Sequence, residues 1–231
     1  MPDVPMVRAV NAQKVYNSGP IQVRALRGVD LSIERGDMVA IMGPSGCGKT
    51  TLLNCFSGLD DLTSGDVFIE GVSLAAMDDD AKSRYRSKRM GFVFQSYNLL
   101  PVLTTVENVE LPLLVARVPA REARRKALAL LKAVELEGWE ELRPSQLSAG
   151  QQQRVAIARA LVNDPAIVWA DEPTGNLDSE TSTQIMDLLV RLNEEQKETL
   201  VLVTHDANVS SRAHRILKMR NGQIVEEQRL R

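Results

Sequence analysis

The stretch that decides the fold is Gly43-Pro44-Ser45-Gly46-Cys47-Gly48-Lys49-Thr50-Thr51. The apolar run before it, residues 38–42, predicts a buried strand, and residues 52–57 after it predict a short helix that ends at Gly58. A strand, a glycine-rich loop with the Gly-x4-Gly-Lys-Thr spacing and a helix form, in this order, the context that a phosphate-binding P-loop requires.

Each residue type in this loop suits the binding of a nucleotide. Glycines let backbone N–H groups turn toward an anion, and the positive end of the following helix adds to the same point. The Lys49 ammonium would reach the β- and γ-phosphates, and the Thr50 hydroxyl is a hard oxygen ligand for Mg²⁺. We therefore expect residues 43–51 to hold a nucleotide and its metal.

The composition limits the classes of protein to which this chain could belong. The chain has 231 residues and a formal net charge of −2, so no basic excess indicates nucleic acid. It contains no apolar run of about 18 residues, and its N-terminus lacks the form of a signal peptide. Cys47 and Cys55 are expected to be reduced thiols of a cytoplasmic protein, although a redox switch on the loop is the alternative for Cys47. Any membrane role would then need a partner.

Three further apolar runs predict core strands, and polar residues follow each of them. The runs are residues 90–94, 166–170 and 200–204, and the polar residues are Gln95, the pair Asp171-Glu172, and His205. The carboxyl ends of core strands are where α/β folds place ligands. Adjacent acids at such an end suit charge chemistry, with Asp171 in water-mediated coordination of Mg²⁺ and Glu172 activating or orienting the attacking water. The alternative is that the pair is only a solvated strand exit.

The other two strand-end residues have both a functional and an ordinary interpretation. Gln95 could contact Mg²⁺ or the γ-phosphate through its amide, or it could be a plain loop glutamine. His205 could donate a hydrogen bond to the γ-phosphate and hold the attacking water, although a single histidine is usually structural. Tyr16 could stack on a base or be a strand-end aromatic of the core.

A second anion site is possible at Leu147-Ser148-Ala149-Gly150-Gln151, which opens a helix. Ser148 and Gln151 have the spacing of a capping box, which explains them without any ligand. The same serine hydroxyl, glycine N–H and helix N-terminus could also bind phosphate. Because the chain has one P-loop, a second phosphate site suggests a nucleotide shared between two chains.

The remaining elements follow from periodicity and turn residues. We expect strands across residues 6–42 with a turn at 17–20, a hairpin within 59–75, a helix over 78–89 and mostly helix over 96–165. A capping box at Thr104 to Glu107 starts one helix, and Asn221-Gly222 joins two terminal strands.

In this order, these motifs resemble those of the ATP-binding cassette (ABC) ATPases. The resemblance makes Gln95 the Q-loop residue, residues 147–151 the signature, Asp171-Glu172 the end of Walker B, residues 175–178 the D-loop and His205 the switch histidine. It implies catalytic roles for Lys49, Gln95, Glu172 and His205, and metal contacts from Thr50, Gln95 and Asp171. It also implies that Tyr16 stacks on adenine. The signature departs from the usual Leu-Ser-Gly-Gly-Gln by Ala149, while Gly150 is retained.

The fold implied by this resemblance is α/β: a P-loop NTPase with a RecA-like ABC ATPase core, an antiparallel β subdomain and a helical signature subdomain. One domain would span residues 1–231, with residues 96–160 as the helical subdomain and residues 1–95 and 161–231 as the rest.

Several stretches are most similar to the ATPases of lipoprotein release and macrolide export (LolD/MacB type) and to the cell-division ATPase FtsE. These stretches are residues 23–29, 92–101, 107–112 and 171–178. The branch implies that two copies bind ATP and Mg²⁺ between them and dock on an integral membrane permease at the inner face of the cell membrane. The alternatives are an FtsE-like ATPase that signals to cell-wall enzymes, and a soluble ABC ATPase of DNA repair or translation.

Overall fold

The computed structural model describes residues 4–19 and 21–230. Residues 1–3, 20 and 231 lie outside it, and with them the first residues of the N-terminal segment and Pro20 of the expected turn. Within the described part, one sheet is antiparallel, with the strand order β2-β1-β4-β5. Its strands are β1 (Val7–Ser18), β2 (Ile21–Ile33), β4 (Ser64–Ile69) and β5 (Val72–Ser73).

The other sheet is the centre of the molecule and has the order β10-β9-β3-β8-β7-β6. Its strands are β3 (Met38–Met42), β6 (Met90–Phe94), β7 (Ile167–Asp171), β8 (Thr199–Thr204), β9 (Arg215–Arg220) and β10 (Gln223–Arg229). All neighbours in it run parallel except β10, which pairs antiparallel with β9. Asp171 lies opposite both Phe94 and Val203, and Met42 lies opposite Thr204. The carboxyl ends of these strands are therefore level, and the residues after them meet at one edge.

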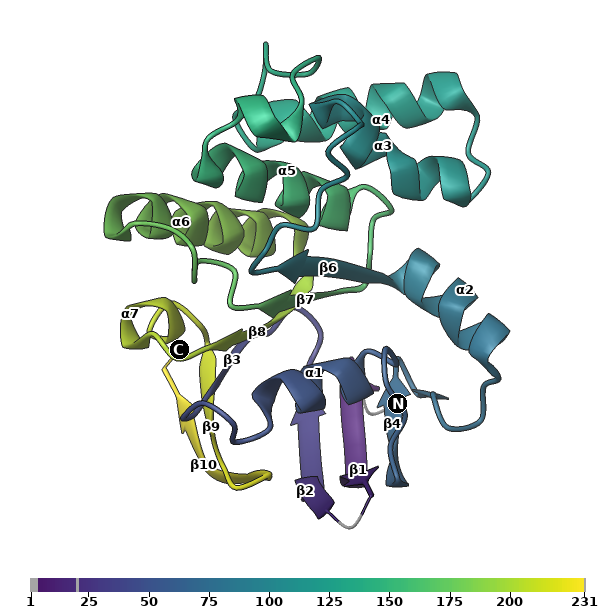
Figure 1. Cartoon of the computed structure of the whole chain (residues 1–231), viewed down its shortest axis with the longest axis vertical. Helices are drawn as coiled ribbons and strands as arrows, with labels where there is room; N and C mark the ends of the chain where they lie inside the picture. Colours follow the sequence, from purple (N-terminus) through teal and green to yellow (C-terminus); the bar gives the residue numbers. More distant parts are fainter. Residues whose placement is uncertain (1–3, 20, 231) are drawn as a thin grey trace.

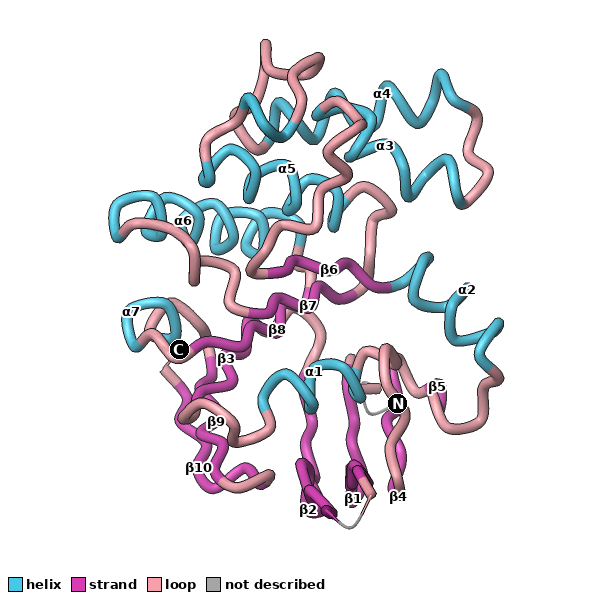
Figure 2. The backbone as a smooth tube through the Cα atoms, in the orientation of Figure 1, coloured by secondary structure: helices cyan, strands magenta, loops and turns pink. Residues whose placement is uncertain are grey.

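Helices cover the central sheet unequally (Figure 1). They are α1 (Lys49–Phe56), α2 (Asp79–Arg89), α3 (Thr105–Val115), α4 (Ala120–Ala133), the 3₁₀ turn η1 (Pro144–Gln146), α5 (Ala149–Leu161), α6 (Ser179–Gln196) and α7 (Ala207–Ser210). Helices α5 and α6 lie over one face with α3 and α4 beyond them, whereas α1 and the antiparallel sheet lie on the opposite side. The tube view shows the same separation of a helical part from a strand-rich part (Figure 2).

Alternate residues of the central strands pack into two separate hydrophobic cores, one on each face of the sheet. In β3, Met38 and Ala40 pack with α3 to α6, whereas Val39 and Ile41 pack with α1 and the antiparallel sheet. Burial on both faces explains why β3, β7 and β8 are continuous apolar runs rather than alternating ones.

The expected α/β architecture is confirmed, including the β4–β5 hairpin, the helix over 79–89 and the terminal hairpin at Asn221-Gly222. One boundary was wrong: the helix after the glycine-rich loop begins at Lys49, not at residue 52. Its apolar residues Leu52, Leu53 and Phe56 face the core, but Gly48 determines where it starts. Among residues 4–19 and 21–230, no helix is both long and apolar enough to cross a bilayer.

Candidate functional site

The glycine-rich loop joins β3 to α1 and leaves the start of the helix open. Gly48 is the N-cap residue, with φ of 106°, and no side chain caps the first turn, which also lacks acidic residues. Lys49 is largely buried, and its Nζ donates to the carbonyl oxygens of Gly43 at 2.8 Å and Pro44 at 3.1 Å. An ammonium held beside uncapped helical N–H groups is an arrangement that attracts a polyanion.

A cleft of about 520 Å³ extends from this loop to Tyr16. Of the expected site residues, Tyr16 and residues 46–51 line it, and Gly43, Pro44 and Ser45 do not. Its other lining residues include Arg24 and Ala25 of β2, together with Asn221 and Gly222 of the terminal hairpin.

The sequence did not indicate those β2 and hairpin residues, because long-range pairing brings them to the loop. Gly222 N–H donates to the Cys47 carbonyl at 2.9 Å, and Arg27 N–H donates to the Gly222 carbonyl at 2.9 Å. The loop, the terminal hairpin and β2 are thus bonded into one wall, although the three segments are distant in the chain.

Thr50 and Asp171 meet where α1 begins and β7 ends. The Thr50 Oγ1 lies 3.4 Å from each carboxylate oxygen of Asp171. Burial, and then the neighbouring charge of Glu172, raise the pKa of Asp171, while Thr50 and Lys49 oppose that shift. A buried carboxylate beside a hydroxyl is a pair of hard oxygen donors that a cation would stabilise.

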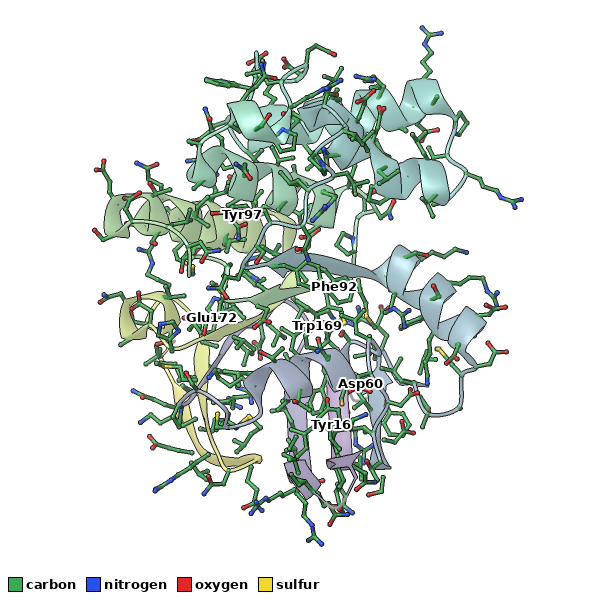
Figure 3. All side chains as sticks on the ribbon, viewed as in Figure 1. Tyr16, Asp60, Phe92, Tyr97, Trp169 and Glu172 are labelled. Carbon is green, nitrogen blue, oxygen red and sulfur yellow. The ribbon has the colours of Figure 1, made fainter. Side chains whose placement is uncertain are left out.

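Glu172 and His205 meet at the ends of β7 and β8. The Glu172 Oε1 lies 2.9 Å from the His205 Nδ1. The Glu172 backbone has φ of 46°, an uncommon value for a residue other than glycine, and its N–H donates to the Val203 carbonyl at 2.9 Å. The Glu172 side chain is only 17% exposed, whereas that of His205 is 68% exposed. The carboxylate is therefore shielded and oriented, while the imidazole can reach a ligand. Figure 3 labels Glu172 at this end of the central sheet.

Gln95 pairs with the segment after Walker B rather than with the acids. Its Nε2 donates to the Asn176 Oδ1 at 3.2 Å, and the Asn176 Nδ2 donates to the Gln95 carbonyl at 3.0 Å. The sequence had indicated Asn176 only as part of the D-loop. This pair connects the end of β6 to the loop that leads into α6.

The signature residues form the expected capping box at the start of α5. The Ser148 Oγ accepts a hydrogen bond from the Gln151 N–H at 3.3 Å, and the Gln151 Oε1 accepts one from the Ser148 N–H at 2.8 Å. Neither these residues nor Gly150 line the P-loop cleft. Helix α5 packs in the core on the far side of the central sheet from α1 (Figure 1). One chain therefore brings together Lys49, Thr50 and Asp171, but not the signature.

Comparisons of this chain with family models, known sequences and solved structures all find ABC ATP-binding proteins. The family model for ABC transporters matches residues 26–175. An uncharacterized ABC transporter ATP-binding protein of Methanocaldococcus jannaschii, MJ0796, is 48% identical over 230 residues, which cover 98% of each chain. The macrolide export ATP-binding/permease protein MacB of Syntrophobacter fumaroxidans is 46% identical over 224 residues, which are 96% of this chain but 31% of that protein. The dimeric structure of MJ0796 in a post-hydrolysis state with ADP and Pi aligns with a TM-score of 0.90 at 47% identity, covering 98% of this chain and 99% of that one.

Proposed function

Since the chain belongs to the ABC transporter family of ATP-binding proteins, we propose that it is an ATPase subunit that powers a separate membrane permease by closing as a homodimer. The observation that carries this proposal is the alignment of the strand ends. It places Thr50 against Asp171 and Glu172 against His205, beside an uncapped helix that begins with Lys49.

Each of these groups has a distinct role in the proposed hydrolysis. The loop N–H groups and Lys49 bind the β- and γ-phosphates, and Lys49 leaves the Gly43 and Pro44 carbonyls to do so. Glu172 orients the attacking water and accepts its proton. With a proton on each ring nitrogen, His205 would hold the Glu172 carboxylate through Nδ1 and donate through Nε2 to the γ-phosphate as charge develops on it.

Mg²⁺ fits the oxygen donors at the end of β7. Burial raises the pKa of Asp171, so a cation beside its carboxylate and the Thr50 hydroxyl would relieve an unfavourable charge. In the part of the chain that the structure describes, no group of three or more His, Cys, Asp or Glu could hold a metal. The Thr50 hydroxyl, the Asp171 carboxylate and the amide oxygen of Gln95, whose amide nitrogen donates to Asn176, are the groups that would hold the ion. When bound, the metal neutralises charge on the transferred phosphoryl group.

The signature of a second copy completes the site. Ser148, Gly150 and Gln151 open α5 with backbone N–H groups and a hydroxyl, yet they lie away from the P-loop of their own chain. In a head-to-tail dimer, each signature would face the phosphates on the partner. The dimeric arrangement of the related MJ0796 cassette supports this proposal.

A permease would dock beside the Q-loop. An apolar groove there is lined by Phe92, Phe94, Leu111, Pro112 and Val115, and Val115 is 70% exposed. Val102, in the loop between β6 and α3, is 72% exposed. The fusion of a related cassette to a permease in MacB supports an exporter-type partner. This docking would hold the chain at the cytoplasmic face of a membrane, with residues 96–160 as the helical subdomain that contacts the permease.

Phosphate release tests the ATPase assignment. Lys49→Ala should abolish turnover, because the charge on the β- and γ-phosphates is lost. Lys132→Ala, which removes an exposed lysine paired with Glu137, is the control and should leave turnover unchanged. Retained phosphate release in Lys49→Ala would show that this loop is not the catalytic one.

The partner is tested by co-purification from membranes with tagged Glu172→Gln in ATP. We expect a permease with membrane spans and an extracytoplasmic domain. The double variant Glu172→Gln/Val115→Asp should no longer capture the permease. The single variant Val115→Asp should keep the basal phosphate release of the wild type. Capture that is unaffected by Val115→Asp would contradict docking in this groove.

A further inference from the structure

Tyr16 is exposed, but a hydrogen bond restrains its ring. It is 40% exposed, lies near the end of β1 and lines the P-loop cleft. Its hydroxyl donates to the Asp60 Oδ2 at 2.7 Å. Figure 3 labels both residues and shows them close together below the central sheet. Because the ring is exposed, this hydrogen bond adds little to the packing of the core. Its effect is to fix the orientation of the ring.

Lys14 completes the cluster. Its Nζ lies 2.5 Å from the Asp60 Oδ1, 2.6 Å from the Asp61 carbonyl oxygen and 4.8 Å from the centroid of the Tyr16 ring. The Lys14 side chain is only 12% exposed and, unlike Tyr16, does not line the cleft. The ammonium thus binds the ring through its π-electrons from outside the cleft.

The charges in this cluster are well defined. Burial raises the pKa of Tyr16, and its bond to Asp60 adds to the shift, so the hydroxyl keeps the proton that it donates. Burial also acts on Asp60, but hydrogen bonds from Lys14 and Tyr16 outweigh it and lower the pKa of that carboxyl. Asp60 therefore remains a carboxylate that accepts from both neighbours.

Asp60 also connects the ring to the phosphate loop. Its N–H donates to the Asn54 carbonyl of α1 at 3.1 Å, and α1 begins at Lys49. Three residues further on, Thr63 N–H donates to the Gln13 carbonyl of β1 at 2.8 Å. The segment that carries Asp60 is thus bonded to α1 at one end and to β1 at the other, which fixes the distance from the P-loop to Tyr16.

We propose that Asp60 and Lys14 are positioning residues for the adenine of the nucleotide, because they hold the Tyr16 ring as a rigid wall of the cleft. Lys14 occupies one side of the ring and leaves the other for the base. The inference rests on the proposed function, in which the cleft takes an adenine nucleotide. It adds that the base contact depends on two side chains that need not touch the nucleotide.

Calorimetric titration with ADP and with pyrophosphate separates base binding from phosphate binding. Asp60→Asn keeps the shape of the side chain but removes its charge, and it should weaken ADP binding roughly threefold. Its affinity for pyrophosphate should stay that of the wild type, which also shows that the variant is folded. Asp61→Asn is the matched control, because the Asp61 carboxylate pairs with Lys82 and not with Tyr16. It should bind both ligands as the wild type does.

A double-mutant cycle with Tyr16→Ala gives the decisive result. Tyr16→Ala alone should weaken ADP binding about fivefold or more, the factor that corresponds to about 1 kcal/mol of base stacking. Asp60→Asn should then have no further effect in the Tyr16→Ala background, since no ring is left to position.

Equal weakening of ADP and pyrophosphate by Asp60→Asn would overturn the inference and indicate a general structural role. Additive effects of Asp60→Asn and Tyr16→Ala would overturn it as well, and so would an unchanged ADP affinity in either variant. A wild-type chain that binds neither ligand would instead refute the proposed function, and the role of Asp60 with it.

Discussion

Gly150→Ala separates the packing role of the signature glycine from its proposed role at phosphate. A Cβ at Gly150 would lie 2.5 Å from the Cγ2 of Thr181 in α6. Thr181 cannot turn its methyl group away freely, because its Oγ1 donates to the Asp178 Oδ2 at 2.7 Å. The clash is therefore relieved only if that bond breaks or if α5 and α6 move apart.

Both routes have a similar cost. Loss of a partly exposed hydrogen bond costs about 1 kcal/mol, and overpacking typically costs about 1–3 kcal/mol. Alanine offsets only a small part of this cost, because its advantage of about 1 kcal/mol over glycine applies to a helix interior and Gly150 lies in the first turn of α5. We expect a net loss of about 1–2 kcal/mol, which lowers Tm by about 2–8 °C in a chain of this length.

Thermal unfolding followed by circular dichroism measures this loss in Gly150→Ala, Thr181→Ser and the double variant. Thr181→Ser removes the clashing methyl group and keeps the hydroxyl bond to Asp178, so the double variant should regain the Tm of Thr181→Ser. Its ATPase activity should remain low, because the added Cβ stays where the backbone would meet the partner's phosphate. An unchanged Tm in Gly150→Ala would refute the packing argument. Recovery of both Tm and activity in the double variant would show that Gly150 serves packing alone.

Three other variants are checked by urea unfolding. Asn108→Ala should lower the free energy of unfolding by about 2–4 kcal/mol. The buried Asn108 Oδ1 accepts a hydrogen bond from the Leu100 N–H, and its Nδ2 donates to three carbonyls of the loop before α3. A loss below about 1 kcal/mol would contradict this prediction. Burial raises the pKa of Glu198 to about 7 from 4.5, so the contribution of this carboxyl to wild-type stability is present below pH 4.5 and is lost as pH rises through about 7. The free energy of unfolding of Glu198→Gln should thus rise relative to that of the wild type between about pH 5 and pH 8. Parallel pH profiles of the two free energies would exclude this effect. Hydrogen bonds from Arg89 lower the pKa of Glu70, so the advantage of wild type over Glu70→Gln should be present above pH 4.5 and vanish as pH falls through the lowered value; an advantage that persists at acid pH would oppose it.

The features that could be predicted from the sequence are those that neighbours in the chain determine. The strand, loop and helix around Lys49 and the polar residues after β6, β7 and β8 are of this kind. The capping boxes at Thr104 and Ser148 are confirmed for the same reason, since each bond joins residues three apart. The start of α1 differed because the apolar pattern marks the buried face of a helix, not its first residue.

The features that could not be predicted depend on which strands become neighbours. Strand β3 lies between β8 and β9, both of which come far later in the chain. Strands β3 and β8 are buried apolar runs of similar composition, whereas β9 carries three basic residues, so no shared pattern marks the three as neighbours. Hence nothing local indicates that Asn221 lines the nucleotide cleft or that Asn176 pairs with Gln95. The bond from Tyr16 to Asp60 likewise exists only because the segment after α1 returns to β1.

Whether two copies of the chain build one nucleotide site is tested most directly by light scattering on Glu172→Gln. Without the base that we propose for hydrolysis, ATP should remain bound. The variant should then have twice the monomer mass in ATP and the monomer mass without it. Adding Ser148→Arg, which places a bulky side chain at the signature, should return the protein to a monomer in ATP. A Glu172→Gln chain that stays monomeric in ATP, or a dimer that Ser148→Arg does not disturb, would contradict the shared site.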